Sequence, residues 1–81
     1  MKIQHYEKTL KDLMALVFKA EKLQIDVDSS IDNIDNWDSI THLNLIIALE
    51  EEFDVSIPDD DVGNMINYKI ILHIITELKE K

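Results

Sequence analysis

Glycine and proline are almost absent from this chain, which contains one of each in 81 residues. Tight hairpins and glycine-rich phosphate loops depend on such residues, because their backbones turn sharply or take positive φ angles. Leu, Ile, Glu and Lys are abundant instead, as is typical of helix-rich chains. The chain is also too short for a Rossmann unit, a kinase or a barrel. These features predict one all-α domain over residues 1–81.

Four helices are expected from the spacing of the apolar residues. Apolar residues three and four positions apart predict a first helix from about residue 3 to about residue 23. The second begins at Ser39 and continues through the unbroken run ITHLNLIIALEEEF. Pro58 suits the first turn of a short third helix at about Asp59–Met65, and Asn67 caps the last helix. We expect an up-down bundle of three longer helices, with the short helix across one end. Its predicted core consists of Leu10, Leu13, Val17, Leu45, Ile46, Leu49, Phe53, Ile71, Ile74 and Leu78.

The first and second helices are joined by a long segment, QIDVDSSIDNIDNWD, which is rich in turn-forming residues. Connections of this length are usually functional. Its alternating acids imitate the start of a calcium-binding loop, but Ile31 stands at the required glycine and Trp37 at the required glutamate. The three histidines lie far apart in the sequence. No metal site is therefore predicted.

Charge is distributed unevenly along the chain. The formal net charge is −9, and residues 36–68 contain eight acids and no Lys or Arg. Such a surface repels nucleic acid and anionic lipid and attracts basic protein surfaces. There is no cysteine for a disulfide, and no apolar stretch approaches the ~18 residues of a membrane span. We expect a soluble, cytoplasmic monomer that neither binds nucleic acid nor inserts stably into membranes.

Ser39, at the predicted start of the second helix, is the main candidate for chemistry. Asp38 before it is a natural N-cap, and a serine beside such a residue is most often only part of the cap. Alternatively, Ser39 carries a phosphoryl group, because amides without intrahelical partners form an anion site there. His42 lies one turn on, but no third orienting group suggests a hydrolytic site.

The residues that follow favour the second interpretation. The segment WDSITHLNLIIALEEEFDVSIPDDDV resembles the acyl carrier proteins, whose signature is Asp-Ser-Leu at the start of a helix that ends in Leu-Glu-Glu-Glu-Phe, followed by Ile-Pro-Asp. The resemblance implies that Ser39 accepts 4′-phosphopantetheine from coenzyme A, through a transferase that uses magnesium and recognises Asp38. Acyl groups are then carried as thioesters on the sulfur of this arm. The chain itself is expected to have no catalytic residue.

The resemblance also implies docking residues for partner enzymes. Ile40 and Ile47 lie off the predicted buried stripe, and we interpret them as a hydrophobic contact. Expected partners are the phosphopantetheinyl transferase and an acyl-loading ligase, synthase or acyltransferase with basic docking patches. The acids expected around this contact are Glu50, Glu51, Asp59 and Asp60.

Departures from the family pattern indicate a specialised carrier. Thr41, His42 and Asn44 stand where fatty acid carriers often have carboxylates, which favours a lipid, polyketide or surface-glycan pathway of narrower scope. Trp37 either packs under the loop or stands beside the arm, as a bulky residue often does in carriers of aminoacyl groups. Two alternatives therefore remain. The chain is an aminoacyl or peptidyl carrier, or it is an acidic helical adaptor in which Ser39 is only a cap.

Overall fold

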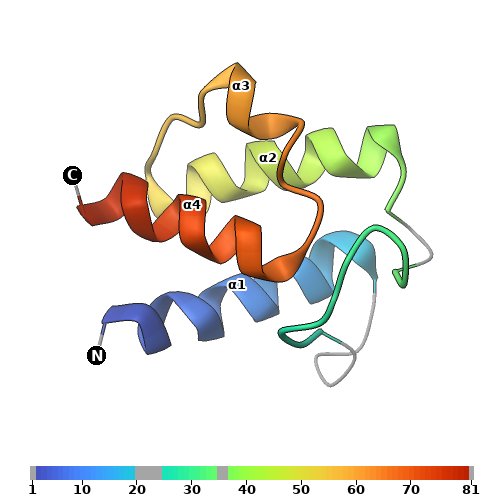
Figure 1. Ribbon diagram of the computed structural model, residues 1–81, viewed down its shortest axis with the longest axis horizontal. Coiled ribbons are helices and arrows are strands. Elements are labelled where there is room, and N and C mark those ends of the chain that lie inside the picture. The colour runs from blue at the N-terminus through green and yellow to red at the C-terminus, as the bar shows by residue number, and fades with distance from the viewer. Residues whose placement is uncertain (1, 20–24, 35–36, 81) are drawn as a thin grey trace.

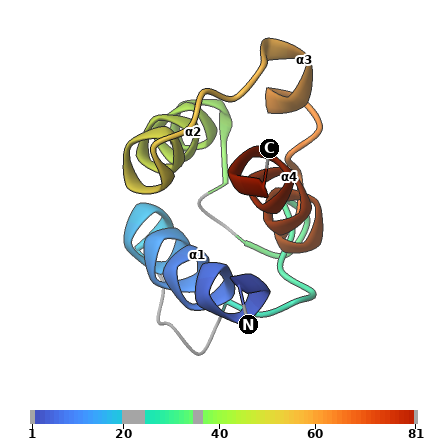
Figure 2. The ribbon, with the colours of Figure 1, turned by 90° about the vertical axis from the view of Figure 1, so that its left-hand side faces the viewer.

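The computed structural model describes residues 2–19, 25–34 and 37–80. In this part of the chain α1 (Lys2–Phe18), α2 (Ser39–Phe53) and α4 (Tyr68–Glu80) are the longer helices, and α3 (Asp59–Val62) is short. Helix α1 packs against both α2 and α4, so the three enclose a common core (Figures 1 and 2). The predicted all-α fold with a short third helix is confirmed. None of the described helices is long and apolar enough to cross a membrane.

The helix directions differ from the predicted up-down alternation. Helix α2 runs antiparallel to α1, but α4 runs in the same direction as α2, because residues 54–67 bring the chain back along the bundle (Figure 1). Both chain ends therefore lie at one end of the bundle, and the start of α2 lies at the other (Figure 1). Near the chain ends, the Tyr6 hydroxyl donates a hydrogen bond to Glu80 Oε2 at 3.2 Å.

Two of the predicted helices are too long. Helix α1 ends at Phe18, and Lys19 takes a left-handed backbone with φ of 55°. The rest of the predicted first helix, residues 20–23, lies outside the described residues. Helix α3 ends at Val62, and Met65 is fully buried in the core instead of extending that helix. The predicted limits of α2 are correct, with Asp54 as its left-handed C-cap.

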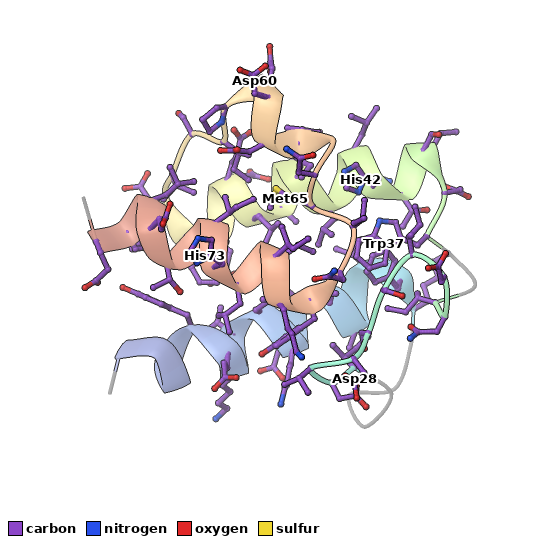
Figure 3. All side chains as sticks on the ribbon, viewed as in Figure 1. Asp28, Trp37, His42, Asp60, Met65 and His73 are labelled. Atoms are coloured by element: carbon purple, nitrogen blue, oxygen red, sulfur yellow. The ribbon has the colours of Figure 1, made fainter. Side chains whose placement is uncertain are left out.

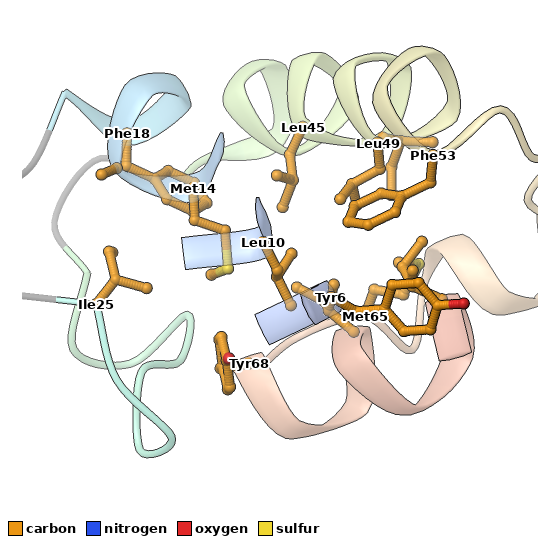
Figure 4. Packing of buried hydrophobic residues seen from close by; sticks show 14 of the residues in the cluster. Tyr6, Leu10, Met14, Phe18, Ile25, Leu45, Leu49, Phe53, Met65 and Tyr68 are labelled. Atoms are coloured by element: carbon orange, nitrogen blue, oxygen red, sulfur yellow. The ribbon is translucent and has the colours of Figure 1, made fainter. Parts of the chain in front are cut away.

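The core combines buried side chains on each longer helix with others from the connections, namely Ile25, Trp37, Ile57 and Met65 (Figure 4). On α1 the main buried row has a spacing of four residues, with Ala15 buried beside it. The row consists of Tyr6, Leu10, Met14 and Phe18. The predicted core row on this helix was Leu10, Leu13 and Val17, with spacings of three and four residues, so only Leu10 is common to both. Four predicted core residues are half-buried and pack against the cluster from its edge. They are Leu13, Val17, Ile74 and Leu78.

Residues 25–34 are fastened to the start of α4 by backbone hydrogen bonds. The Tyr68 amide donates to the Ser29 carbonyl at 2.9 Å, and the Ile31 amide donates to the Ile66 carbonyl at 2.9 Å. Ser29 is itself buried, and its Oγ accepts the Asp26 amide at 2.8 Å. This connection is therefore a fixed part of the domain surface, as its buried polar group requires.

Tyr68 is fully buried, and its hydroxyl has no hydrogen-bond partner among the described residues. Burial, together with the nearby charge of Glu7, raises the pKa of this phenol from its ordinary value of 10 to about 12. The neutral phenol is therefore favoured in the folded state. Its contribution to stability is present below pH 10 and is lost as the pH rises through about 12.

We expect the free energy of unfolding to fall between pH 10 and pH 12, and Tyr68→Phe to reduce this fall. The substitution removes an ionisable group whose hydroxyl bonds to none of the described residues, so it should cost little stability at neutral pH. Urea denaturation across this pH range measures the effect. Tyr6→Phe is the control, because it keeps Tyr68. Equal alkaline slopes in all three proteins would contradict the prediction.

Candidate functional site

Ser39 is the first residue of α2 and is exposed. The residue before it, Asp38, has an extended backbone and caps the helix through two hydrogen bonds. Its Oδ1 accepts the Thr41 amide at 2.8 Å, and its carbonyl accepts the His42 amide at 2.8 Å. Asp38 therefore satisfies first-turn amides, as predicted for the N-cap.

The cap is strongest when Asp38 is ionised. The backbone hydrogen bond from Thr41 is the main cause that lowers the pKa of the Asp38 carboxyl below its ordinary value. A carboxyl group with a lowered pKa stabilises the folded state at pH values above its ordinary pKa. This stabilisation is lost as the pH falls through the pKa of the group in the folded state. At neutral pH the start of α2 is thus held in its capped form.

The indole of Trp37 is buried beneath this turn. Its ring centre lies 4.7 Å from that of Phe18, at the end of α1. Its ring N–H donates to His42 Nδ1 at 2.9 Å. Trp37 therefore packs under the loop, the first of its two sequence-based interpretations, and connects the start of α2 to the end of α1.

His42 joins α2 to the end of α3. Its Nε2 lies 2.8 Å from the Val62 carbonyl oxygen, while Nδ1 faces Trp37 Nε1. The indole N–H can only donate, so Nδ1 accepts, and Nε2 must carry the proton that is donated to Val62. The two bonds therefore select the Nε2–H tautomer of His42. Figure 3 labels His42 and Trp37, which lie close together. One clue in the sequence was missed, since a buried tryptophan N–H needs an acceptor.

A groove of about 540 Å³ opens beside Ser39. Most of its lining side chains are apolar, and they come from residues 25–34, from the start of α2 and from the α3–α4 connection. The lining residues are Ile31, Trp37, Asp38, Ser39, His42, Leu43, Gly63 and Ile66. Several large apolar side chains are therefore left outside the core next to the exposed serine.

A second apolar feature lies on the outer face of α2. Ile40, Leu43 and Ile47 are 74%, 57% and 56% exposed, respectively, and their spacing of three and four residues places them on one face. We call these three residues the α2 stripe. Ile40 and Ile47 thus lie outside the core, in agreement with their sequence pattern. Leu43 was missed because the sequence does not separate it from the buried row beside it.

The acidic residues expected around the stripe differ in their surroundings. Glu51, Asp59 and Asp60 are exposed. Glu50 is half-buried, and its Oε2 accepts the Ile57 amide at 2.8 Å. Glu50 therefore holds the α2–α3 connection in place, a structural role that the sequence did not reveal.

The described residues contain no group of three His, Asp or Glu side chains placed to hold a metal ion. In the acidic connection, Asp26 Oδ1 accepts the Asp28 amide at 2.9 Å, and Ser30 Oγ accepts the Asp32 amide at 3.2 Å. These oxygens serve as turn caps. The side chain of His5 lies outside the described part.

Comparison with known proteins adds three findings. A family model described as a phosphopantetheine attachment site matches residues 8–66, a range that includes Ser39. A relative named acyl carrier protein from Campylobacter jejuni subsp. doylei is 39% identical over 77 residues, which cover 89% of this chain and 97% of the relative. Another acyl carrier protein, from Clostridium acetobutylicum, is 36% identical over 65 residues and covers 73% of this chain and 84% of the relative.

Among solved structures, the solution structure of a holo acyl carrier protein from Geobacter metallireducens is similar, with a TM-score of 0.79. The two chains share 22% sequence identity, over 89% of this chain and 83% of the other. This similarity is one of fold.

We expect His42→Ala to lower the free energy of unfolding by about 1–3 kcal/mol, because it leaves a buried indole N–H and a carbonyl without partners. Asn44→Ala is the control. Asn44 is exposed on the same helix, and its replacement should change the free energy by less than about 0.5 kcal/mol. Urea denaturation followed by Trp37 fluorescence measures both. Equal stability of the two variants would show that the Trp37–His42–Val62 bonds do not support the fold.

Proposed function

This chain belongs to the phosphopantetheine-dependent acyl carrier proteins, and from that premise we propose that Ser39 is the residue to which its cofactor is attached. The cofactor of the family, 4′-phosphopantetheine, supplies the thiol on which acyl groups are held as thioesters. An acyl carrier protein is a carrier and not an enzyme. It interacts with a phosphopantetheinyl transferase and with the biosynthetic enzymes that use its acyl group.

The exposed position of Ser39 at the first residue of α2 is the observation that supports this assignment. The positive end of the α2 dipole, with its first-turn amides, stabilises a phosphate ester at that position. Because Asp38 makes the capping bonds, the fold does not require the Ser39 hydroxyl. The serine can thus be modified while the helix start stays in place.

Attachment is a transfer of the phosphopantetheinyl group from coenzyme A. The Ser39 oxygen forms a bond to the phosphorus next to the pantetheine, and the anhydride bond to the adenosine bisphosphate breaks. The adenosine bisphosphate leaves, and the hydroxyl proton passes to a base of the transferase. Access to the serine oxygen is the contribution required of this chain.

We assign partner docking to the α2 stripe together with the exposed acids Glu51, Asp59 and Asp60. An apolar centre with charged residues around it suits transient contacts with basic surfaces. Glu50 remains part of the proposed docking surface, and its hydrogen bond from the Ile57 amide gives it a structural role as well.

We further propose that the cargo is an acyl intermediate of a specialised lipid, polyketide or surface-glycan pathway. Support comes from the start of α2, where Thr41 and Asn44 are uncharged and the His42 ring is bonded to Val62. A partner that recognises this turn needs no dense basic patch against it. Loading assays with purified fatty acyl and aminoacyl ligases distinguish acyl from aminoacyl cargo.

Incubation with a phosphopantetheinyl transferase, magnesium and coenzyme A should convert the protein fully to the phosphopantetheinylated form, and Ser39→Ala should abolish this conversion. Intact-protein mass spectrometry measures the adduct. The variant should remain folded, with a stability loss below about 1 kcal/mol, because Asp38 still caps α2.

Ser56→Ala is the matched control, since Ser56 is also exposed but lies beyond the end of α2. It should be modified as the unaltered protein is. An adduct on Ser39→Ala would refute the assignment of Ser39. No adduct on the unaltered protein would favour the acidic adaptor, in which Ser39 is only a cap.

Charge and apolar contact should affect different rates of partner binding. Glu51→Lys should slow association with the transferase, and the defect should shrink as salt screens the lost attraction. Ile47→Ala should instead speed dissociation by about tenfold with little dependence on salt, since a central contact mainly affects the off-rate. Stopped-flow binding at two salt concentrations separates the two effects.

Both side chains are exposed, so both variants should fold normally. Circular dichroism on each variant checks this. A salt-independent defect in Glu51→Lys, or unaltered dissociation in Ile47→Ala, would remove the corresponding residue from the docking surface.

A further inference from the structure

Helix α3 carries two of the exposed acids that we assign to docking, and a single histidine on α2 connects it to the rest of the domain by a hydrogen bond. We propose that His42 is a positioning residue for partner docking, because its bond to Val62 holds α3, with Asp59 and Asp60, at a fixed place beside α2. This inference rests on the proposed function, which assigns the two acids to partner recognition. It gives His42 a part in recognition that is exerted through α3.

Helix α3 has few contacts of its own that would hold it in place. It lies on the side of α2 and α4 that faces away from α1 (Figures 1 and 2). Residues 58–64, all within the described part of the chain, include no buried side chain, and α3 has no side-chain cap at its start. Val62, at its end, is half-buried against the core. A helix of four residues is not stable without outside contacts.

The bond from His42 is the hydrogen bond that connects this segment to a distant part of the chain. Its Nε2 lies 2.8 Å from the Val62 carbonyl oxygen, 20 residues away in the sequence. Among the described residues, the other hydrogen bonds of residues 58–64 join near neighbours. The Asp61 and Val62 amides, for example, donate to the Pro58 carbonyl at 2.9 and 3.3 Å.

The local bonds make α3 and the turn after it one unit. The Asn64 side-chain amide donates to the Asp60 carbonyl at 3.1 Å, and its backbone amide donates to the Asp61 carbonyl at 3.0 Å. Asp59 and Asp60 lie within one helical turn of Val62. A shift of the Val62 carbonyl therefore moves both acids with it.

The His42 ring is itself held from its other side. Its Nδ1 accepts the Trp37 ring N–H at 2.9 Å, and the two rings are stacked, with centres 6.1 Å apart and planes 23° apart. Trp37 is buried and packs against Phe18 at the end of α1. The imidazole is thus fixed by a bond and a stacking contact, so that its Nε2–H is directed at Val62. Through these contacts α3 is connected to the core.

The position of these charges affects how a partner meets the surface. Asp59 and Asp60 are exposed, and the Asp60 side chain points outward from α3 (Figure 3). The attraction between charges falls with distance, and a charge that is already held in place needs less ordering when a partner binds. Glu51 lies on α2 itself and does not depend on α3. Loss of the His42 bond should therefore weaken the contribution of the α3 acids and leave that of Glu51 unaltered.

The test is a double-mutant cycle on the full chain, with association to a purified phosphopantetheinyl transferase measured by stopped flow at low salt. His42→Leu keeps the bulk of the side chain and removes both bonds. It should slow association roughly threefold, but less than about 1.5-fold in protein that already carries Asp59→Asn and Asp60→Asn. Glu51→Gln is the matched control, because its effect and that of His42→Leu should multiply.

A conservative variant separates positioning from loss of the ring. His42→Gln retains a hydrogen-bond acceptor and a donor, so it should restore most of the association rate that His42→Leu loses. A purely structural role would lower the stability of each variant without any dependence on the α3 acids. Equal effects of His42→Leu with and without those acids would overturn the proposal. Association of His42→Gln as slow as that of His42→Leu would overturn it too.

Circular dichroism before each measurement ensures that folded proteins are compared. If His42→Leu does not fold, Trp37→Phe takes its place in the cycle, since it removes the bond that fixes the imidazole, and the same dependence on the α3 acids is expected. If Asp59→Asn with Asp60→Asn leaves association unchanged, the docking assignment in the proposed function fails, and this inference fails with it. If that pair slows association but the effect of His42→Leu is independent of it, only the positioning role is wrong.

Discussion

The contact of Trp37 with both Phe18 and His42 determines how the ends of three elements meet. The indole ring packs 4.7 Å from the ring of Phe18 at the end of α1, and its N–H is accepted by His42 in the first turns of α2. The same imidazole reaches the carbonyl of Val62, the last residue of α3. A chain without disulfides thus uses one aromatic pair and two hydrogen bonds to position the turn that presents Ser39.

The regular parts of the fold were predictable because their signals are local. Asp38 at the cap and an unbroken helical run fix the limits of α2, and Asn67 marks the start of α4. The direction of α4 was not predictable from such signals, since it depends on how residues 54–67 cross the bundle. The end of α1 was also missed. The residues after Phe18 in the sequence, Lys-Ala-Glu-Lys-Leu, are all good helix formers, and only the left-handed backbone of Lys19 shows that the helix has ended.

The same contrast between local and long-range signals applies to the candidate site. Ser39 and Asp38 belong to a motif that can be recognised from the sequence alone. The roles of His42 and Glu50 depend instead on partners 20 and 7 residues away in the sequence, namely the Val62 carbonyl and the Ile57 amide. A surface glutamate in an acidic helix looks like a docking charge until its hydrogen bond is known. Side chains that resemble recognition residues in the sequence can therefore serve the fold as well.

Both ends of the chain lie at the end of the bundle opposite the start of α2 (Figure 1). The molecule measures 33 Å along its longest axis. A tag, a fluorophore or a tether to a solid support placed at either end is therefore held away from Ser39. A protein immobilised in this way presents its modification site outward, so surface-based binding experiments on this carrier can use either end for attachment.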